Sequence, residues 1–223
     1  MKRAPEHLRF AAMAVDAVVF AVLDGTLKVL VAEVNSASPY KGLEAFPGGL
    51  IRESETAEDA IVRVLKEKAD ITPTHVEQLY TFSALERDKR DRVVSVAYLA
   101  FVSPTLAEAY THPDAHFVPV KKVGQLGYDH NEILAVALAR VRGKITYTNL
   151  AQFLLPRHFT LSELQFVYEL ILGTELDKRN FRKKIIALDL VKETGTKQEG
   201  VKNRPALLYE FTSRALKELP LII

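Results

Sequence analysis

The sequence predicts a two-domain α/β protein, in which a larger α/β domain is followed by a smaller domain with a helix-turn-helix and a β-hairpin. Residues 1–143 alternate β-rich runs with an amphipathic helical stretch, which is typical of a sheet covered by helices. Residues 144–223 contain two capped helical stretches and then two β-rich runs. The charge changes at the same point, from 17 basic and 19 acidic residues in the first part to 13 and 9 in the second.

Composition narrows the class of protein. The 223 residues are 48% hydrophobic and 26% charged, as in ordinary globular proteins. The chain contains no cysteine, which excludes disulfides, thiolate zinc sites and cysteine nucleophiles and fits a cytoplasmic protein. The basic N-terminus is followed by a strand-like run and not by about 18 apolar residues, so we expect neither a membrane span nor a signal peptide.

The first domain begins with a predicted hairpin. Two β-rich runs, 16–23 and 26–34, are joined by Asp24-Gly25, which is a strong turn signal. Residues 46–49, Phe-Pro-Gly-Gly, then interrupt the chain, and their glycines permit close backbone approach to a ligand. Residues 56–68 follow with apolar side chains at helical spacing, which predicts an amphipathic helix.

The stretch 49–71 has the spacing of a Nudix box. In that pattern a glycine is followed by five residues and a glutamate, then by seven residues and Arg-Glu-hydrophobic-any-Glu-Glu-any-Gly-hydrophobic. The stretch therefore resembles the Nudix hydrolases, which implies a Nudix α/β/α sandwich with a pocket beside the helix. Matching positions are Gly49, Glu55, Arg63, Leu65, Glu67 and Ile71, and departing positions are Val64, Lys68 and Asp70.

The departures affect the metal site that the resemblance implies. Positions 64, 67 and 68 share one helix face. The resemblance implies that in the enzymes of this family this face carries carboxylates that bind magnesium or manganese. Here the face carries Val64, Glu67 and Lys68, and one carboxylate beside an ammonium is a poor site for a hard divalent cation. We therefore expect no metal, no cofactor and no hydrolysis by this box. The alternative is an active ADP-ribose or nucleoside-diphosphate-sugar pyrophosphatase with an accessory domain.

Two more strands are expected at 77–85 and 92–102, and the charged run 86–92 lies between them. This run is either a solvated loop or a phosphate or sugar clamp at the pocket mouth, because arginine contacts phosphate in a bidentate manner. Asp129 and Glu132 fit a capping box for the next helix, and His130 is more typical of a structural histidine than of a ligand contact.

A diphosphate ligand without a metal would need cationic side chains and backbone N–H groups for neutralisation. The expected effector-binding residues are Phe46, Gly48, Gly49, Arg52, Glu67, Lys68, Arg87 and Arg92.

The second domain is predicted from local capping signals. Thr160 and Glu163 form a capping box for a helix with one apolar stripe, and Gly173 ends that helix. Asp177 can cap a second, basic helix, and two strands then flank the loop 195–204. The stretch 141–159 before them carries apolar residues, so we expect a packed connector and place the domain boundary at Lys144, giving domains 1–143 and 144–223.

Helix, turn, basic helix and a hairpin with a basic tip are the layout of a winged helix-turn-helix. From residue 177 to 204 there are 9 basic and 4 acidic residues, so a recognition helix and a wing could contact DNA. The alternative is a protein-interaction domain with a solvated basic face. The expected DNA-binding residues are Lys178, Arg179, Asn180, Arg182, Lys183, Lys197, Lys202 and Arg204.

A degenerate Nudix domain joined to a winged helix resembles the Nudix-related transcriptional regulators. The resemblance rests on the altered box, the strand at 93–101, the helices at 160–191 and the wing at 203–211. It implies a bacterial regulator whose first domain senses ADP-ribose, a related metabolite of NAD, or a sugar such as arabinose. A homodimer on a palindromic operator is expected, because two-fold symmetry matches two half-sites.

Overall fold

The first two strands form the hairpin that the sequence predicts. In the computed structural model, which describes residues 10–35, 37–200 and 205–223, β1 (Ala12–Leu23) pairs antiparallel with β2 (Thr26–Glu33). Asp24 and Gly25 have φ angles of 50° and 66°, the positive values that a tight hairpin turn requires.

Strand β1 is the central strand of a mixed seven-stranded sheet. The order along the sheet is β3-β2-β1-β6-β5, with β4 on β1 and β7 on β2. Only the pairing of β1 with β6 is parallel among the strand pairs described. The other strands are β3 (Glu44–Ala45), β4 (Gly48–Leu50), β5 (His75–Phe82), β6 (Val93–Phe101) and β7 (Ala115–Pro119).

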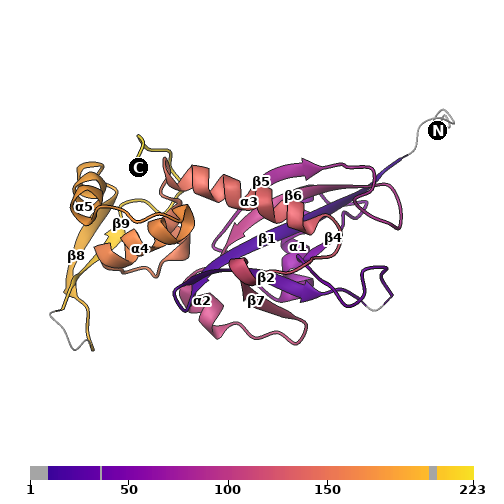
Figure 1. Ribbon diagram of the computed structural model, residues 1–223, viewed down its shortest axis with the longest axis horizontal. Helices are drawn as coiled ribbons and strands as arrows, with labels where there is room; N and C mark the ends of the chain where they lie inside the picture. Colours follow the sequence, from indigo (N-terminus) through magenta and orange to yellow (C-terminus); the bar gives the residue numbers. More distant parts are fainter. Residues whose placement is uncertain (1–9, 36, 201–204) are drawn as a thin grey trace.

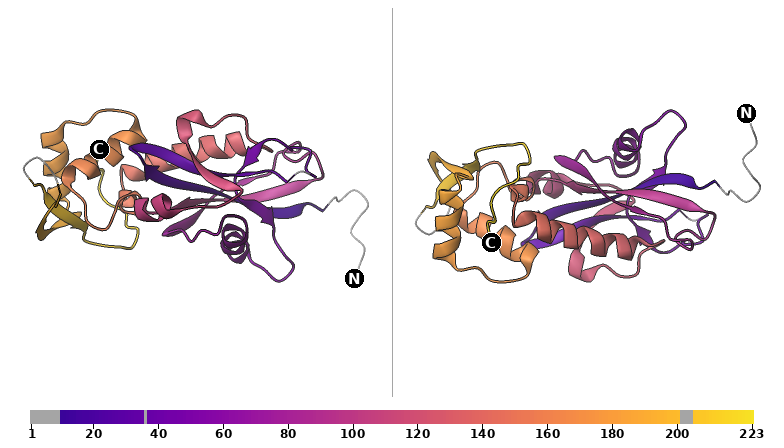
Figure 2. Two further views of the ribbon diagram at one scale, coloured as in Figure 1. Left: turned by 90° about the horizontal axis from the view of Figure 1, so that it is seen from below. Right: turned by 90° about the horizontal axis from the view of Figure 1, so that it is seen from above.

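Helices cover both faces of this sheet, as Figure 2 shows from two sides. Helix α1 (Ala57–Ala69) packs against the odd-numbered residues of β1, such as Val15 and Val19. Helix α3 (His130–Ile145) packs against Val18 and Phe20 on the opposite face. The alternation along β1 therefore separates two hydrophobic cores, which is the α/β/α sandwich predicted from the sequence.

The helix of the box has well-defined ends. Thr56 and Asp59 form a capping box at its start, and Asp70 ends it with a left-handed backbone at φ 44°. Its buried residues include Ile61, Val64 and Leu65. The predicted amphipathic helix is therefore confirmed, with Val64 on its core side.

The predicted capping box at the start of α3 is wrong. Asp129 is the N-cap residue of α3, but its side chain makes no capping hydrogen bond. It accepts two hydrogen bonds from the Arg87 guanidinium instead, at 2.8 and 3.0 Å. A charged partner brought close by the fold thus displaces the local capping interaction that the sequence pattern favours.

The C-terminal part contains the predicted helix-turn-helix and hairpin. Thr160 and Glu163 cap α4 (Leu161–Leu172), Gly173 ends it at φ 74°, and Asp177 caps α5 (Lys178–Ala187) by accepting from the Asn180 N–H. Strands β8 (Val191–Lys197) and β9 (Leu207–Phe211) pair antiparallel as the wing. The remaining short elements are α2 (Pro104–Ala109) and the 3₁₀ turns η1 (Val120–Lys122) and η2 (Leu150–Leu154).

The two parts of the elongated molecule meet at η2 and at the end of α3 (Figure 1). Leu150, Ala151, Phe153 and Leu154 of η2 are buried, so the connector packs as expected. One core cluster continues from the α3 face of the sheet through η2 into α4 and α5. Helix α3 runs to Ile145, beyond the boundary proposed at Lys144, and that boundary stays a prediction. Within the described ranges, every helix is too short or too polar to cross a bilayer.

Candidate functional site

A cavity of about 460 Å³ lies where β1, β2, β4, the end of α1, the loop 86–92 and the start of α3 converge. Its wall includes the backbone of Gly48 and Gly49, the Phe46 ring and the Tyr128 ring. Its polar side chains are Asp16, Glu33, Asn35, Ser38, Lys68, Arg87, Asp88, Arg90 and His130. Cations therefore face the cavity from α1 and from the charged run.

Arg87 lies at the base of this cavity in a buried charge network. Its side chain is 3% exposed and its guanidinium donates to Asp129 at 2.8 Å and to Asp16 at 3.1 Å. Ser95 also donates to Asp16, at 2.6 Å. The network joins β1, β6, the loop 86–92 and the start of α3, so it fixes the elements that shape the cavity.

His130 belongs to the same network. Its Nδ1 accepts a hydrogen bond from the Phe46 N–H at 2.9 Å, and its Nε2 lies 3.4 Å from Asp16. The ring is buried and stacks on the Phe46 ring at 5.2 Å, in keeping with the expected structural histidine. Burial opposes ionisation of Asp16, but His130, Ser95 and Arg87 outweigh that effect and hold its pKa at about 2.

The two glycines of residues 46–49 are needed for a reason other than ligand approach. A Cβ atom on Gly48 would lie 1.9 Å from Oδ1 of Asp16, and one on Gly49 would lie 3.1 Å from Cγ2 of Val64. Strand β4 therefore passes so close to β1 that a side chain at Gly48 would clash with Asp16, and one at Gly49 would require Val64 to shift by a few tenths of an ångström.

The helix face of the box does not fit a divalent metal. Val64 is fully buried, and Lys68 brings an ammonium to the cavity. The two remaining carboxylates of the box, Glu55 and Glu67, accept hydrogen bonds from arginines. Arg63 donates to Glu55 at 2.5 and 2.8 Å and to Glu67 at 3.1 Å, and Arg52 donates to Glu67. Arg63 holds the pKa of Glu55 at about 2. Among the described residues, no three His, Cys, Asp or Glu side chains gather where they could hold a metal ion.

On this helix, the Lys68 ammonium is the group that can best replace the positive charge of a metal ion. The side chain is exposed as a whole, yet its position beside the cavity removes part of its hydration and lowers its pKa. Asp16 acts in the opposite direction, and Arg90 and Arg63 lower the pKa further.

The structure separates the predicted effector residues into two sets. Phe46, Gly48, Gly49, Lys68 and Arg87 line the cavity. Arg52, Glu67 and Arg92 do not: the first two form the ion pairs of the box, and Arg92 donates to the carbonyls of Ala84 and Val93.

Sequence reasoning missed Arg90 and Tyr128. The Arg90 guanidinium lies 5.4 Å from the centre of the Tyr128 ring and donates to Asp88 at 2.7 Å. Arg87 and Arg90 of the charged run both line the cavity and Arg92 does not, a difference that the sequence of the run does not encode.

The second candidate site is the basic face of α5. Phe181 and Ile185 are buried, whereas Lys178, Arg179, Asn180 and Lys183 are exposed. Lys197 is exposed on β8, and Lys202 and Arg204 lie outside the described residues. Arg182 differs from its neighbours, because it is half-buried and donates to the Ser162 hydroxyl of α4 at 2.9 Å.

Comparison with known proteins is consistent with this geometry. Residues 13–140 match the model of the NUDIX domain, and residues 151–211 match that of the NrtR DNA-binding winged helix domain. The chain belongs to the Nudix family, in its NrtR-type branch with a winged helix. The predicted family and fold class are thereby confirmed.

Relatives of this branch cover most of the chain. A protein of Acinetobacter baylyi described as "ADPR responsive transcriptional repressor NtrR" is 34% identical over 89% of this chain and 81% of its own length. Shewanella oneidensis NrtR in complex with a 27-mer DNA is 35% identical, with a TM-score of 0.79 over 89% of this chain and 93% of that one. The Nudix domain of the same protein with ADP-ribose is 31% identical, with a TM-score of 0.54 over 63% of this chain and 94% of that domain.

Proposed function

We propose that this chain is a ligand-responsive transcriptional repressor that binds operator DNA through its winged helix. Its Nudix domain binds ADP-ribose as the effector. The observation that carries the proposal is the pairing, in one chain, of two features. One is a Nudix cavity that has Lys68, Arg87 and Arg90 in its wall and lacks the row of metal-binding carboxylates, and the other is a winged helix with a basic α5. The homologue of Acinetobacter baylyi, described as an ADPR-responsive repressor, supports this reading over most of the chain.

The effector binds in the cavity of about 460 Å³, between α1 and the loop 86–92. A diphosphate needs neutralisation, and Lys68 and Arg90 are the cations that face the cavity without being enclosed between two carboxylates as Arg87 is. Tyr128, whose ring packs against the Tyr40 ring at 4.2 Å between centres and an angle of 41°, is the aromatic side chain placed to contact a nucleobase. We therefore place Phe46, Lys68, Arg90 and Tyr128 in the effector site, with Arg87 as its structural base.

DNA binds across α5 and the wing. The exposed cations of α5 project on the side opposite Phe181 and Ile185, which hold the helix against α4. A helix with one packed and one basic face is suited to the major groove, and the wing cations to phosphates. Two copies would bind one palindromic operator as a homodimer. Operator DNA lies in the cytoplasm, so the protein is expected there.

Hydrolysis of the effector is not part of this function. A Nudix pyrophosphatase needs several carboxylates on the box helix, and here Val64 is in the core while Arg63 occupies Glu55 and Glu67. The competing function is ADP-ribose hydrolysis. It is supported by the match of residues 13–140 to the NUDIX domain and by a 32% identity over 98 residues with an ADP-ribose pyrophosphatase of Methanocaldococcus jannaschii, which covers 44% of this chain and 58% of that protein.

Calorimetry and product analysis test the effector assignment together. ADP-ribose titrated into the full chain should bind in a magnesium-independent manner, and AMP should not accumulate on incubation with magnesium. Arabinose and NAD serve as competing ligands. Binding of arabinose alone would replace ADP-ribose by a sugar effector, and sustained AMP formation would establish the hydrolase.

A further inference from the structure

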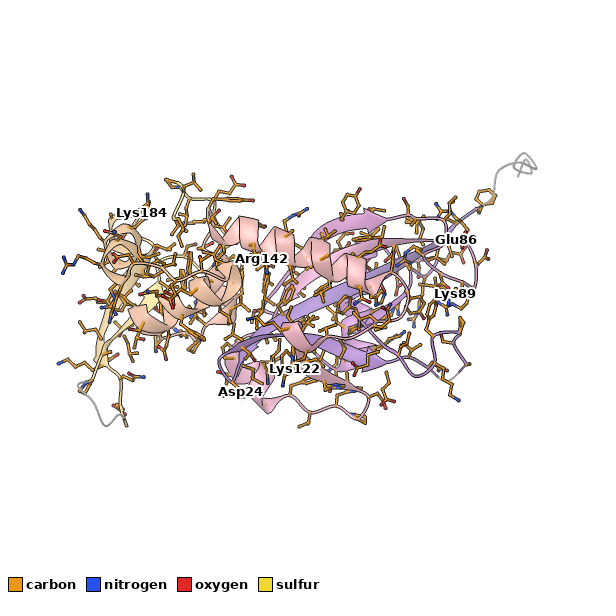
Figure 3. All side chains as sticks on the ribbon, viewed as in Figure 1. Asp24, Glu86, Lys89, Lys122, Arg142 and Lys184 are labelled. Carbon is orange, nitrogen blue, oxygen red and sulfur yellow. The ribbon has the colours of Figure 1, made fainter. Side chains whose placement is uncertain are left out.

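Helix α5 carries two stripes of side chains. Phe181 and Ile185 form the first, and both are buried in the core that holds the helix in the winged domain. The second stripe follows the helical spacing i, i+3, i+4 and i+7 and consists of Arg179, Arg182, Lys183 and Ile186. In Figure 3, the labelled Lys184 marks this helix at the opposite end of the molecule from Lys89 of the loop 86–92.

Ile186 differs from the rest of the second stripe. Its three companions are cations, whereas the Ile186 side chain is apolar and 56% exposed. Of the ten residues of α5, all of which the structure describes, Ile186 alone is a large apolar side chain outside the core. Its neighbour Ile185 is fully buried, so the packing of α5 depends on Ile185 and not on Ile186.

The second stripe fits within the major groove of DNA. From Arg179 to Ile186 the helix rises about 10 Å, at ~1.5 Å per residue, and the groove is about 12 Å wide. A recognition helix lies in this groove, so both ends of the stripe can face base edges. Ile186 therefore reaches the bases beside the cations that precede it in the stripe.

The major groove offers an isoleucine one matching group. Base edges there present hydrogen-bond donors and acceptors, apart from the C5-methyl group of thymine. Contact between isoleucine and this methyl group removes two apolar surfaces from water. Contact with a cytosine amino group or a guanine carbonyl would instead remove water from a polar group without replacing its hydrogen bond. An isoleucine in this position therefore favours thymine over the other bases.

We propose that Ile186 is a specificity-determining residue that reads the C5-methyl group of one thymine in each half-site of the operator. This inference rests on the proposed function. The cations of the stripe bind phosphates and polar base edges, and Ile186 adds a discrimination that their hydrogen bonds do not supply.

The test removes the methyl group from the DNA and the side chain from the protein, separately and together. A duplex is selected by the full chain from a synthetic random-sequence pool, in which thymine is the only base with a C5-methyl group. Each thymine of the selected duplex is then replaced in turn by deoxyuridine, and fluorescence anisotropy gives the Kd. For one thymine per half-site, the replacement should weaken binding by the unsubstituted chain about fourfold, the factor for one buried methyl-sized group. The same replacement should leave the Kd of Ile186→Ala unchanged.

Three further variants make the test specific. Val62→Ala shortens an exposed apolar side chain of α1, and Lys184→Ala removes an exposed cation of α5 that lies outside the second stripe. Both should keep the fourfold penalty for deoxyuridine. Ile186→Val retains two methyl groups and should keep most of this penalty.

The outcomes separate the inference from the proposed function. Ile186→Ala should keep the Tm of the unsubstituted chain and still bind DNA, because the side chain is exposed and the cations remain. The absence of a thymine with the expected penalty, or an equal penalty in Ile186→Ala, overturns the thymine contact. Loss of all DNA binding in Ile186→Ala overturns it as well, since a single methyl contact cannot have that effect. Failure of the unsubstituted chain to bind any duplex contradicts the proposed function itself.

Discussion

Arg87 is the side chain on which the shape of the cavity most depends. Its guanidinium is enclosed between Asp16 and Asp129, which come from β1 and from the start of α3. A buried cation between two carboxylates compensates charges that would otherwise repel each other and lose hydration. Arg87 is therefore a structural residue first, although it also reaches the cavity wall.

Replacing Arg87 by methionine should lower the free energy of unfolding by about 3–5 kcal/mol, because two buried carboxylates lose their shared partner. Urea denaturation at neutral pH measures this change. Arg52→Met is the matched control, since Arg52 is 59% exposed and its pairing with Glu67 should contribute at most about 1 kcal/mol. Equal effects of the two substitutions would contradict the structural role of Arg87.

Asp16 should make stability depend on pH. Its folded-state pKa of about 2 lies below the ordinary value, so its contribution is fully present above pH ~4 and is lost as pH falls toward 2. The size of this contribution is about 2 kcal/mol, at 1.36 kcal/mol per pKa unit. Urea denaturation between pH 6 and pH 2.5 should show a steeper loss for the unsubstituted chain than for Asp16→Asn. Parallel curves would remove Asp16 from the acid sensitivity.

Strand β4 and helix α3 contain glycines with opposite roles. At Gly48 a Cβ atom would meet Asp16 at 1.9 Å, whereas at Gly143 in α3 it would meet no atom within 4 Å. Gly48→Ala should therefore destabilise by roughly 3 kcal/mol through overpacking. Gly143→Ala should stabilise by about 0.5–1 kcal/mol through helix propensity. Thermal denaturation separates the two, and similar shifts in Tm would show that β4 has more room than the distances indicate.

Helix α5 presents cations in two different settings, and this predicts different contributions to DNA binding. Arg182 is held by Ser162, so its guanidinium is oriented before DNA arrives, whereas Lys184 is exposed. If Arg182 pairs with a guanine edge, Arg182→Ala should cost about 1–3 kcal/mol more on the selected duplex than on a scrambled one. Lys184→Ala should weaken both duplexes equally. Anisotropy at several salt concentrations measures this, and equal losses for Arg182→Ala would exclude base readout.

The elements that were predictable from the sequence have their determinants close together in the chain. Asp24-Gly25 sets its own turn, Thr160 caps through Glu163, and Asp177 caps through the Asn180 N–H, each within four residues. Asp129 was wrongly predicted as a side-chain cap, because its partner Arg87 is 42 residues away.

The candidate cavity was harder to predict for the same reason. Whether Arg87, Arg90 or Arg92 faces inward depends on contacts with β1 and α3, and no spacing within the run 86–92 encodes it. Gly48 and Gly49 line the cavity and also pack closely against Asp16 and Val64, a contact that the sequence does not reveal; their contact with an effector stays a prediction.

The whole molecule behaves as two functional parts on one continuous core. The α3-side core extends from β1 through η2 into α4 and α5, so a change at the cavity can reach the basic helix without a flexible linker. In the proposed function, this continuity connects the two domains. The cavity would supply differential affinity for the effector, and the winged helix would convert it into binding or release of DNA.

DNA binding by the full chain with and without ADP-ribose tests this account most directly. Fluorescence anisotropy should show tight, salt-dependent binding to the selected duplex, and saturating ADP-ribose should raise the Kd by about 5- to 150-fold without forming AMP. AMP at the same concentration should have a much smaller effect. An unchanged Kd at saturating ADP-ribose, or a change that appears only as ADP-ribose is hydrolysed, would contradict the account.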